Sequence, residues 1–154
     1  MRYNITILLL FSMALTASAQ MDEKTLVQKT IEGFFDAFHK KDSVAMKSFV
    51  AENVVLQTTG RNRAGETIFE TTPISKLYES IVRISDSIPF QEKLISWSIQ
   101  VDRTMANAWV GYEFWLNDNF SHCGINSFQM VNFDGEWKII YLIDTRGRAG
   151  CLEE

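Results

Sequence analysis

Residues that bind metal ions are scarce in this sequence. Its 154 residues include two histidines and two cysteines. His39 and His122 form neither an H-x-x-x-H nor an H-E-x-x-H pattern, and zinc enzymes of the common classes use such spacings. The sequence also lacks the G-x-G-x-x-G and P-loop patterns that hold nucleotide phosphates, and the G-x-S-x-G turn of serine hydrolases. We therefore expect no metal and no cofactor.

Positive charge is also in short supply. Fifteen Lys and Arg residues stand against 19 Asp and Glu, which gives a net charge of −4 at pH 7. The adjacent pair Lys40-Lys41 is typical of a solvated helix end. Proteins that bind nucleic acid carry a basic patch, so we expect no nucleic-acid partner. A composition of 46% hydrophobic and 22% charged residues is ordinary for a folded domain, and the length suits one domain.

Only the N-terminus carries a long apolar run. Arg2 precedes the apolar stretch from Ile5 to Leu15, and the small residues Ala17-Ser18-Ala19 follow it. The run is shorter than the roughly 20 residues that span a bilayer, and its pattern is that of a signal peptide. We interpret residues 1–19 as a signal peptide and residues 20–154 as one domain. We therefore expect a periplasmic or secreted protein with no membrane association after cleavage; the alternative is an uncleaved anchor.

The two cysteines, Cys123 and Cys151, could form a disulfide in an oxidising compartment. Closing this loop would stabilise the domain by roughly 3 kcal/mol. The bond requires Cα atoms within about 7 Å of each other, so the alternative of two free thiols stays open here.

The sequence pattern in the first half of the domain predicts helices. Asp22 and Asp42 are suited to cap two of them, and Thr72 to cap a third that begins with Pro73. The first helix carries one apolar stripe with steps of three, four and seven residues, formed by Leu26, Val27, Ile31, Phe34, Phe35 and Phe38.

The second half predicts strands. Ile95, Trp97 and Ile99 alternate with polar residues and should share one face, and Asp134-Gly135 is a strong hairpin signal. The predicted strands span residues 53–59, 66–71, 95–101, 106–116, 123–133 and 137–146. This order predicts an α+β fold in which three N-terminal helices pack on a strongly curved antiparallel sheet. Strand 106–116 is apolar on both faces, and the helices can cover only one, so we expect a homodimer through the other.

An uninterrupted hairpin around Asp134-Gly135 would pair His122 with Gly147. His122, Asp144 and Arg146 would then gather at one end of the sheet. His122 and Asp144 are our candidate catalytic residues, because an imidazole oriented by a carboxylate can shuttle protons near neutral pH. The alternative is an ion pair between Asp144 and Arg146 at the rim, with His122 exposed in a turn.

Other polar or aromatic side chains in the strands and the first helix could reach a cavity. Glu113 shares a strand face with Trp109 and Trp115, and could be either a cavity acid or a charge in a dimer interface. Tyrosines on strands also serve as ordinary packing residues. The candidate ligand-binding residues are Phe38, Tyr112, Glu113, Trp115, Asn126, Tyr141 and Arg146.

The C-terminal sequence carries a family resemblance. The segments 124–131 (GINSFQMV), 134–140 (DGEWKII) and 143–146 (IDTR) resemble exported bacterial members of the nuclear transport factor 2-like superfamily, which includes SnoaL-like and ketosteroid isomerase-like proteins. The resemblance implies a cone-shaped fold with a cavity between helices and sheet, and dimers through the outer face. It does not imply one function, since members include isomerases, dehydratases, hydrolases, carriers and binding modules.

Three functional hypotheses follow. The first is an exported protein that binds a small, partly apolar molecule in the cone, because the sequence is rich in aromatics and has no recognisable catalytic set. The alternative is a SnoaL-like enzyme that transfers protons, as an isomerase, dehydratase or hydrolase. The third is an interaction protein that holds a protein partner at the open mouth.

Overall fold

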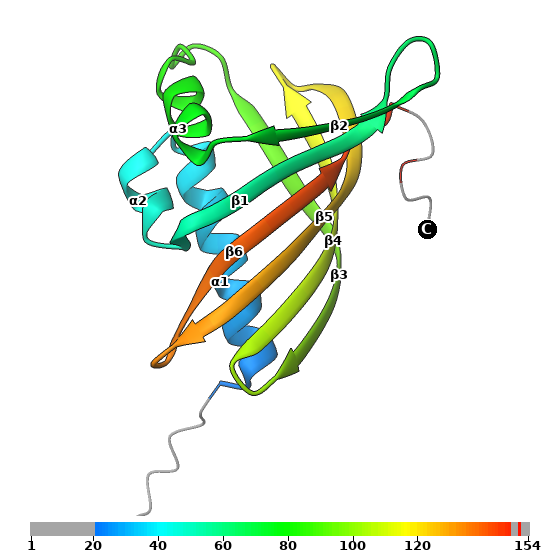
Figure 1. Cartoon of the computed structure of the whole chain (residues 1–154). Helices are drawn as coiled ribbons and strands as arrows, with labels where there is room; N and C mark the ends of the chain where they lie inside the picture. The colour runs from blue at the N-terminus through cyan, green and yellow to red at the C-terminus, as the bar shows by residue number, and fades with distance from the viewer. Residues whose placement is uncertain (1–20, 149–150, 152–154) are drawn as a thin grey trace, which may run out of the picture.

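The computed structural model describes residues 21–148 and residue 151. The expected signal peptide, residues 1–19, lies outside this part of the chain. The structure contains the helices and strands α1 Glu23–His39, α2 Ser43–Lys47, β1 Val50–Arg61, β2 Thr67–Thr72, α3 Ile74–Val82, β3 Phe90–Asp102, β4 Met105–Leu116, β5 Asn119–Phe133 and β6 Glu136–Thr145 (Figure 1).

Helices α1 and α2 begin as the sequence predicts. The Asp22 side chain accepts a hydrogen bond from Thr25 N, and that of Asp42 accepts from Val44 N and Ala45 N. These bonds satisfy amide groups that have no partner within the helix. Helix α3 differs from the prediction, because its N-cap is Pro73 rather than Thr72 and makes no side-chain capping bond.

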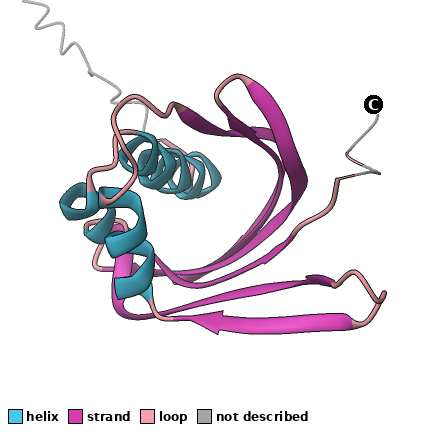
Figure 2. Cartoon of the chain, turned by 90° about the horizontal axis from the view of Figure 1, so that it is seen from above, coloured by secondary structure: helices cyan, strands magenta, loops and turns pink. Residues whose placement is uncertain are grey.

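The six strands form one sheet in the order β2-β1-β6-β5-β4-β3. All neighbouring pairs are antiparallel except β1 and β6, which run parallel. Seen from above, the sheet bends around α1, which lies against its concave face (Figure 2). The α+β fold with helices on a strongly curved sheet is thus confirmed, with one parallel pair added to the expected antiparallel strands.

Three of the four register irregularities in the sheet decide which side chains face the cone. The register shifts by one residue between Leu94 and Ser96 in β3, between Phe114 and Trp115 where β4 pairs with β5, and between Gln129 and Met130 where β5 pairs with β6. A one-residue shift moves the following side chains to the opposite face of a strand.

Because of the bulge between β5 and β6, the register of the last hairpin differs from the predicted one. Gly147 pairs with Cys123 rather than with His122, and Asp144 pairs with Asn126. Directly paired residues share a face, so Asp144 and Asn126 point into the cone together.

The core fills the space between α1 and the concave face. It joins the predicted apolar stripe of α1 to side chains of β4, β5 and β6, and its fully buried members include Val27, Ile31, Met46, Val110, Phe128, Met130 and Ile139. Within the residues described, no helix is long and apolar enough to cross a bilayer.

The structure joins Cys123 and Cys151 in a disulfide with a Cα–Cα distance of 5.7 Å. Cys123 is buried on the outer face of β5. The bond therefore ties the chain beyond β6 back onto the sheet.

Candidate functional site

A cavity of about 140 Å³ lies inside the cone. We call it the cone cavity. One wall is apolar and consists of Phe34, Phe35, Phe38, Leu56, Leu77 and Leu142, whereas the polar wall consists of Gln57, Thr58, Thr72, Glu92, Asn126, Asp144 and Arg146. Side chains from α1, α3 and several strands meet here, so the cavity exists only in the assembled fold.

Glu92 places a carboxyl group on the polar wall. Its Oε1 accepts a hydrogen bond of 2.6 Å from Asn126 Nδ2, and Asn126 is 3% exposed. Loss of hydration raises the pKa of Glu92 to about 7; the charge of Asp144 adds to the rise, while the Asn126 bond and Arg146 oppose it. A carboxyl group with this pKa is present in both protonation states near neutral pH.

The backbone next to Glu92 is held by the end of α1. The amide N of Glu92 donates a hydrogen bond of 2.9 Å to His39 Nε2. Burial lowers the pKa of His39, so this imidazole is neutral and can accept the bond. The bond fixes the start of β3 against α1.

Asp144 is the centre of a second polar group on the same wall. It accepts hydrogen bonds from Thr58 Oγ1, from Arg146 Nε at 2.6 Å and from Tyr112 Oη at 3.4 Å. The single proton of Tyr112 Oη is shared with the carbonyl of Thr145, which lies nearer at 2.9 Å. Burial, together with the charges of Asp144 and Glu92, raises the pKa of Tyr112, so its hydroxyl stays a donor.

His122 lies on the concave side near the mouth of the cone. Its ring stacks on Phe114 with centroids 5.0 Å apart and meets Tyr112 edge-on at 5.8 Å. Its Nδ1 lies 3.1 Å from Ser121 Oγ. Burial first, and then the charge of Arg146, lower the pKa of His122. No hydrogen bond joins it to Asp144 in the described part of the chain.

Solved structures share the fold of this chain at low sequence identity. An NTF2-like protein of unknown function from Shewanella baltica superposes with a TM-score of 0.58 at 14% identity, over 81% of this chain and 94% of its own. A cystatin-like-fold protein from Nostoc punctiforme gives 0.63 at 14% identity, over 82% and 92%. An NTF2-like protein from Cytophaga hutchinsonii gives 0.62 at 15% identity, over 82% and 100%. This chain has the nuclear transport factor 2-like (NTF2-like) fold.

The likeness concerns the fold and carries no activity with it. A scan against protein-family models and a search of curated proteins give no match to this sequence. The function of this NTF2-like chain must therefore be argued from its own site.

The NTF2-like cone brings together some of the predicted site residues. Phe38, Asn126, Asp144 and Arg146 line the cone cavity, and Tyr112 is bonded to Asp144. Asp144 and Arg146 form the ion pair that the sequence analysis gave as the alternative to catalysis.

Three of the predicted ligand-binding residues lie outside the cone. Glu113 accepts a hydrogen bond of 3.0 Å from Trp115 Nε1 on the outer face of β4. Tyr141 hydrogen-bonds Gln57, and it pairs with Gln129 and Val55 rather than with the inward-facing Phe128. The β5–β6 bulge is the physical reason that Tyr141 lies on the face of the sheet opposite to Phe128.

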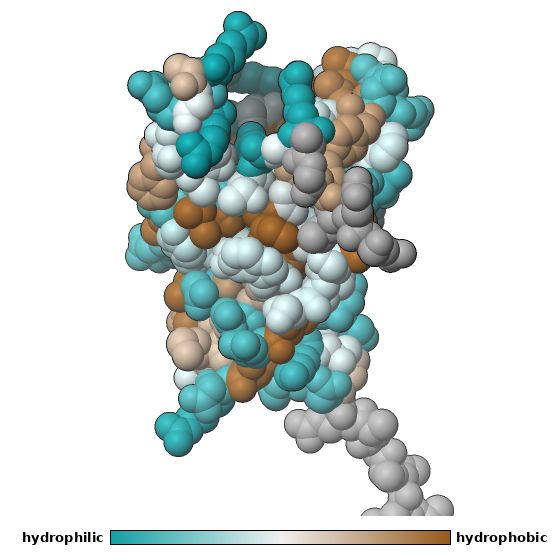
Figure 3. All heavy atoms as spheres, turned by 90° about the vertical axis from the view of Figure 1, so that its right-hand side faces the viewer, coloured by the Kyte–Doolittle hydropathy of each residue, from teal (hydrophilic) through white to brown (hydrophobic). Residues whose placement is uncertain are grey.

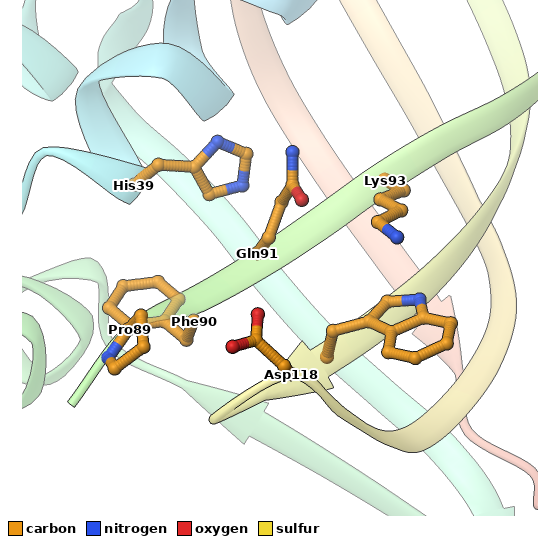
Figure 4. A pocket seen from close by; sticks show the side chains of 7 residues that line it. His39, Pro89, Phe90, Gln91, Lys93 and Asp118 are labelled. Atoms are coloured by element: carbon orange, nitrogen blue, oxygen red, sulfur yellow. The ribbon is translucent and has the colours of Figure 1, made fainter.

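An open groove lies at the β3 edge of the sheet, and Figure 4 shows side chains that line it. Its volume is about 480 Å³, and its lining residues are His39, Pro89, Phe90, Gln91, Lys93, Trp115 and Asp118. Lys93 Nζ lies 4.1 Å from the centre of a Trp115 ring, as in a cation–π contact. The one carboxylate in this lining set, Asp118, belongs to an exposed turn, so the buried polar groups make the cone cavity the better candidate.

Sequence reasoning missed Glu92. The alternation of Ile95, Trp97 and Ile99, continued backwards, places Glu92 on the outer face. Ile95 is instead the extra residue of the β3 bulge and is 44% exposed. The alternation of Phe90, Glu92 and Leu94 was the available signal for an inward carboxyl group.

The part of the chain that the structure describes contains no group of three His, Cys, Asp or Glu residues that could hold a metal ion. The buried polar groups of the polar wall instead have hydrogen-bond partners within the protein. Among the residues that the structure describes, no buried side-chain nitrogen or oxygen lacks such a partner.

Proposed function

We propose that this protein binds a small amphipathic molecule in the cone cavity. The observation that carries the proposal is the division of the cavity into an aromatic and aliphatic wall and a hydrogen-bonded wall with two carboxyl groups. Ligand sites of proteins combine apolar linings with a few placed polar groups in this way.

The size of the cavity limits the ligand. An apolar cavity of about 150 Å³ can hold a molecule the size of benzene, and the 140 Å³ of the cone cavity are of the same order. The ligand is therefore a compact molecule, or the compact end of a longer one that leaves through the mouth.

Blocking the cavity tests the proposal. Leu77 on α3 lines the cavity, and Leu77→Trp should fill it. Val82→Trp is the matched control, because Val82 lies on the same helix and is 61% exposed. Compact amphipathic probes such as phenol, cyclohexanol and cyclohexanone should raise the melting temperature of the wild type and of Val82→Trp, and should not raise that of Leu77→Trp. Failure of every probe on the wild type, or equal responses of the two variants, would contradict binding in the cone.

A second candidate function, proton transfer, rests on Glu92. A carboxyl group with a pKa of about 7 beside a cavity can accept a proton from a bound molecule and return it. Asp144 already accepts three hydrogen bonds, and His122 is not among the residues that line the cavity. Glu92 therefore suits the role of base better than the predicted His122 and Asp144.

Exchange of carbon-bound hydrogen tests this second candidate. In D₂O, the Glu92 carboxylate would take an α-proton of bound cyclohexanone, and deuterium would be returned to the same carbon. NMR should show exchange with the wild type and background exchange with Glu92→Gln, while both proteins still bind the ketone. Equal exchange rates would exclude Glu92 as the base.

The proposal also includes export of the protein and its assembly into a homodimer. The signal-like run at residues 1–19 and the disulfide support an oxidising compartment. The outer face of the sheet supports a homodimer, because it exposes Ile95 at 44%, Met105 at 57%, Trp109 at 54% and Phe120 at 38%. Hydrophobic side chains lie in the middle of the surface in Figure 3, which looks at the molecule from the right of Figure 1.

A further inference from the structure

A second hollow lies outside the cone, between the β1–β2 turn, the start of β5 and the chain after β6. Its volume is about 800 Å³, and four arginines, Arg61, Arg63, Arg146 and Arg148, contribute to its lining. We call it the arginine cleft. Figure 3 shows a hollow flanked by hydrophilic side chains at the top of this side of the molecule. We propose that the arginine cleft binds a multivalent oxyanion, namely a phosphate group or a set of carboxylates on one small molecule.

The charge distribution carries the proposal. The whole chain has a net charge of −4, yet the residues lining this cleft include four arginines and no Asp or Glu. Arg146 is paired with Asp144 at 2.6 Å. Among the described residues, the other three arginines form no ion pair. Gathering like charges in one concave surface is unfavourable until an anion enters, and such a surface attracts anions over a distance.

The β1–β2 side of the cleft is shaped by its own hydrogen bonds. Asn62 Oδ1 accepts from Ala64 N at 2.9 Å and from Glu66 N at 3.0 Å. Arg61 Nη1 donates to the carbonyl of Gly65 at 2.7 Å. The nearest carboxylate of the turn, that of Glu66, accepts from Asn62 Nδ2 at 2.8 Å and is not among the lining residues. The turn therefore holds its arginines without neutralising them.

The opposite side is fixed by β5. Cys123 and Gly147 exchange two backbone hydrogen bonds of 2.9 Å, and the disulfide from Cys123 to Cys151 closes the chain just beyond Arg148. The backbone is thus anchored to β5 at Gly147, just before Arg148, and again at Cys151. A site whose backbone is already positioned loses less entropy on binding.

The chemistry of the lining selects the ligand class. A guanidinium group presents planar donors that match carboxylate and phosphate oxygens two at a time. Three arginines that form no ion pair of their own among the described residues favour an anion of two or three charges over chloride or acetate. His122 also lines the cleft, and because burial lowers its pKa, it adds a neutral donor or acceptor.

The arginine cleft meets the cone cavity at one residue. Arg146 lines both, and its guanidinium Nε is bonded to the buried Asp144. An anion in the cleft and a molecule in the cone would therefore contact the two sides of one ion pair. The anion site itself does not depend on what occupies the cone.

Titration calorimetry at constant ionic strength tests the proposal, with inorganic phosphate and citrate as probes. The wild type should bind one or both in a single saturable site. Arg63→Gln combined with Arg148→Gln should weaken this binding by about tenfold or more, since bonds to charged groups are the strong ones. Arg103→Gln is the control, because Arg103 lies in the β3–β4 turn at the far end of the sheet.

The outcomes separate the possibilities. Binding of phosphate alone identifies a phosphate site, and binding of citrate alone identifies a polycarboxylate site. Leu77→Trp should leave anion binding unchanged, so failure of the cone proposal would not affect this result. Absence of saturable binding to the wild type, or an equal loss in Arg103→Gln, would overturn the proposal.

Discussion

Glu92 shows how one side chain can set the chemistry of a site. It stands on the polar wall of an otherwise half-apolar cavity, bonded to a buried amide. Removing a carboxylate from water costs free energy unless bonds and charges compensate. Asn126 and Arg146 compensate only in part, and the pKa of Glu92 stays raised at about 7.

The raised pKa makes a prediction for stability. Folding raises the pKa of Glu92 from 4.5 to about 7. The stability that Glu92 contributes to the folded state is therefore fully present below pH 4.5 and is lost as the pH rises through 7. Glu92→Gln keeps an acceptor for Asn126 and removes the charge. The variant should therefore be more stable than the wild type at pH 8, by on the order of 3 kcal/mol, and lose this advantage at pH 4.

Urea denaturation at several pH values measures this difference. Glu113→Gln makes the same change on the outer face and controls for the loss of one negative charge from the whole molecule. A stability difference between Glu92→Gln and the wild type that does not vary with pH would contradict the raised pKa.

At the scale of the secondary structure elements, close approach of β5 and β6 shapes the polar wall. A Cβ atom added to Gly124 would lie 1.9 Å from the carbonyl oxygen of Thr145. That same carbonyl accepts the hydrogen bond from Tyr112. Only glycine lets the β6 backbone come this near to β5, and this places the carbonyl within reach of Tyr112.

Gly124→Ala should therefore be strongly destabilising. The methyl group must displace backbone rather than a flexible side chain, and we expect a loss of about 3 kcal/mol or more in the free energy of unfolding. Gly60→Ala is the matched control on β1, because its added Cβ would meet nothing closer than 3.7 Å. Chemical denaturation of both variants measures the effect, and similar stabilities for the two would show that β6 can move away at little cost.

At the scale of the whole molecule, the disulfide links the chain end to the middle of the sheet. Cys123 and Cys151 are 28 positions apart, and closing a loop of this length restricts the unfolded chain. Cys151→Ser should lower the free energy of unfolding by about 3 kcal/mol. Treatment of the wild type with a reducing agent should produce the same loss and leave Cys151→Ser unchanged. A variant as stable as the oxidised wild type would show that the bond contributes nothing to folding.

The outer face of the sheet makes a prediction about assembly. If two copies cover this face, Trp109→Lys places a charge within an apolar contact and should yield monomers. Val82→Lys is the control, since Val82 is also apolar and exposed but lies on α3. Light scattering after size-exclusion chromatography should give twice the monomer mass for the wild type and for Val82→Lys. A monomeric wild type would contradict the homodimer.

The sequence by itself determined the type and order of the elements, because local signals suffice to define them, although β3 begins at Phe90 and not at the predicted Ile95. The stripe from Val27 to Phe35 marks α1, Asp22 and Asp42 cap the helices, and Asp134-Gly135 turns the last hairpin, all as found. Their order was enough to predict the α+β fold with helices on a curved sheet.

Only the tertiary structure decided which side chains meet in the cone. Each strand alternates its faces, so a single inserted residue reverses every side chain beyond it. The bulge at Ile95 turned Glu92 inward, and the bulge in the last hairpin turned Tyr141 outward and Asp144 inward. The position of a bulge depends on how two strands pair, which the alternation within one strand does not specify.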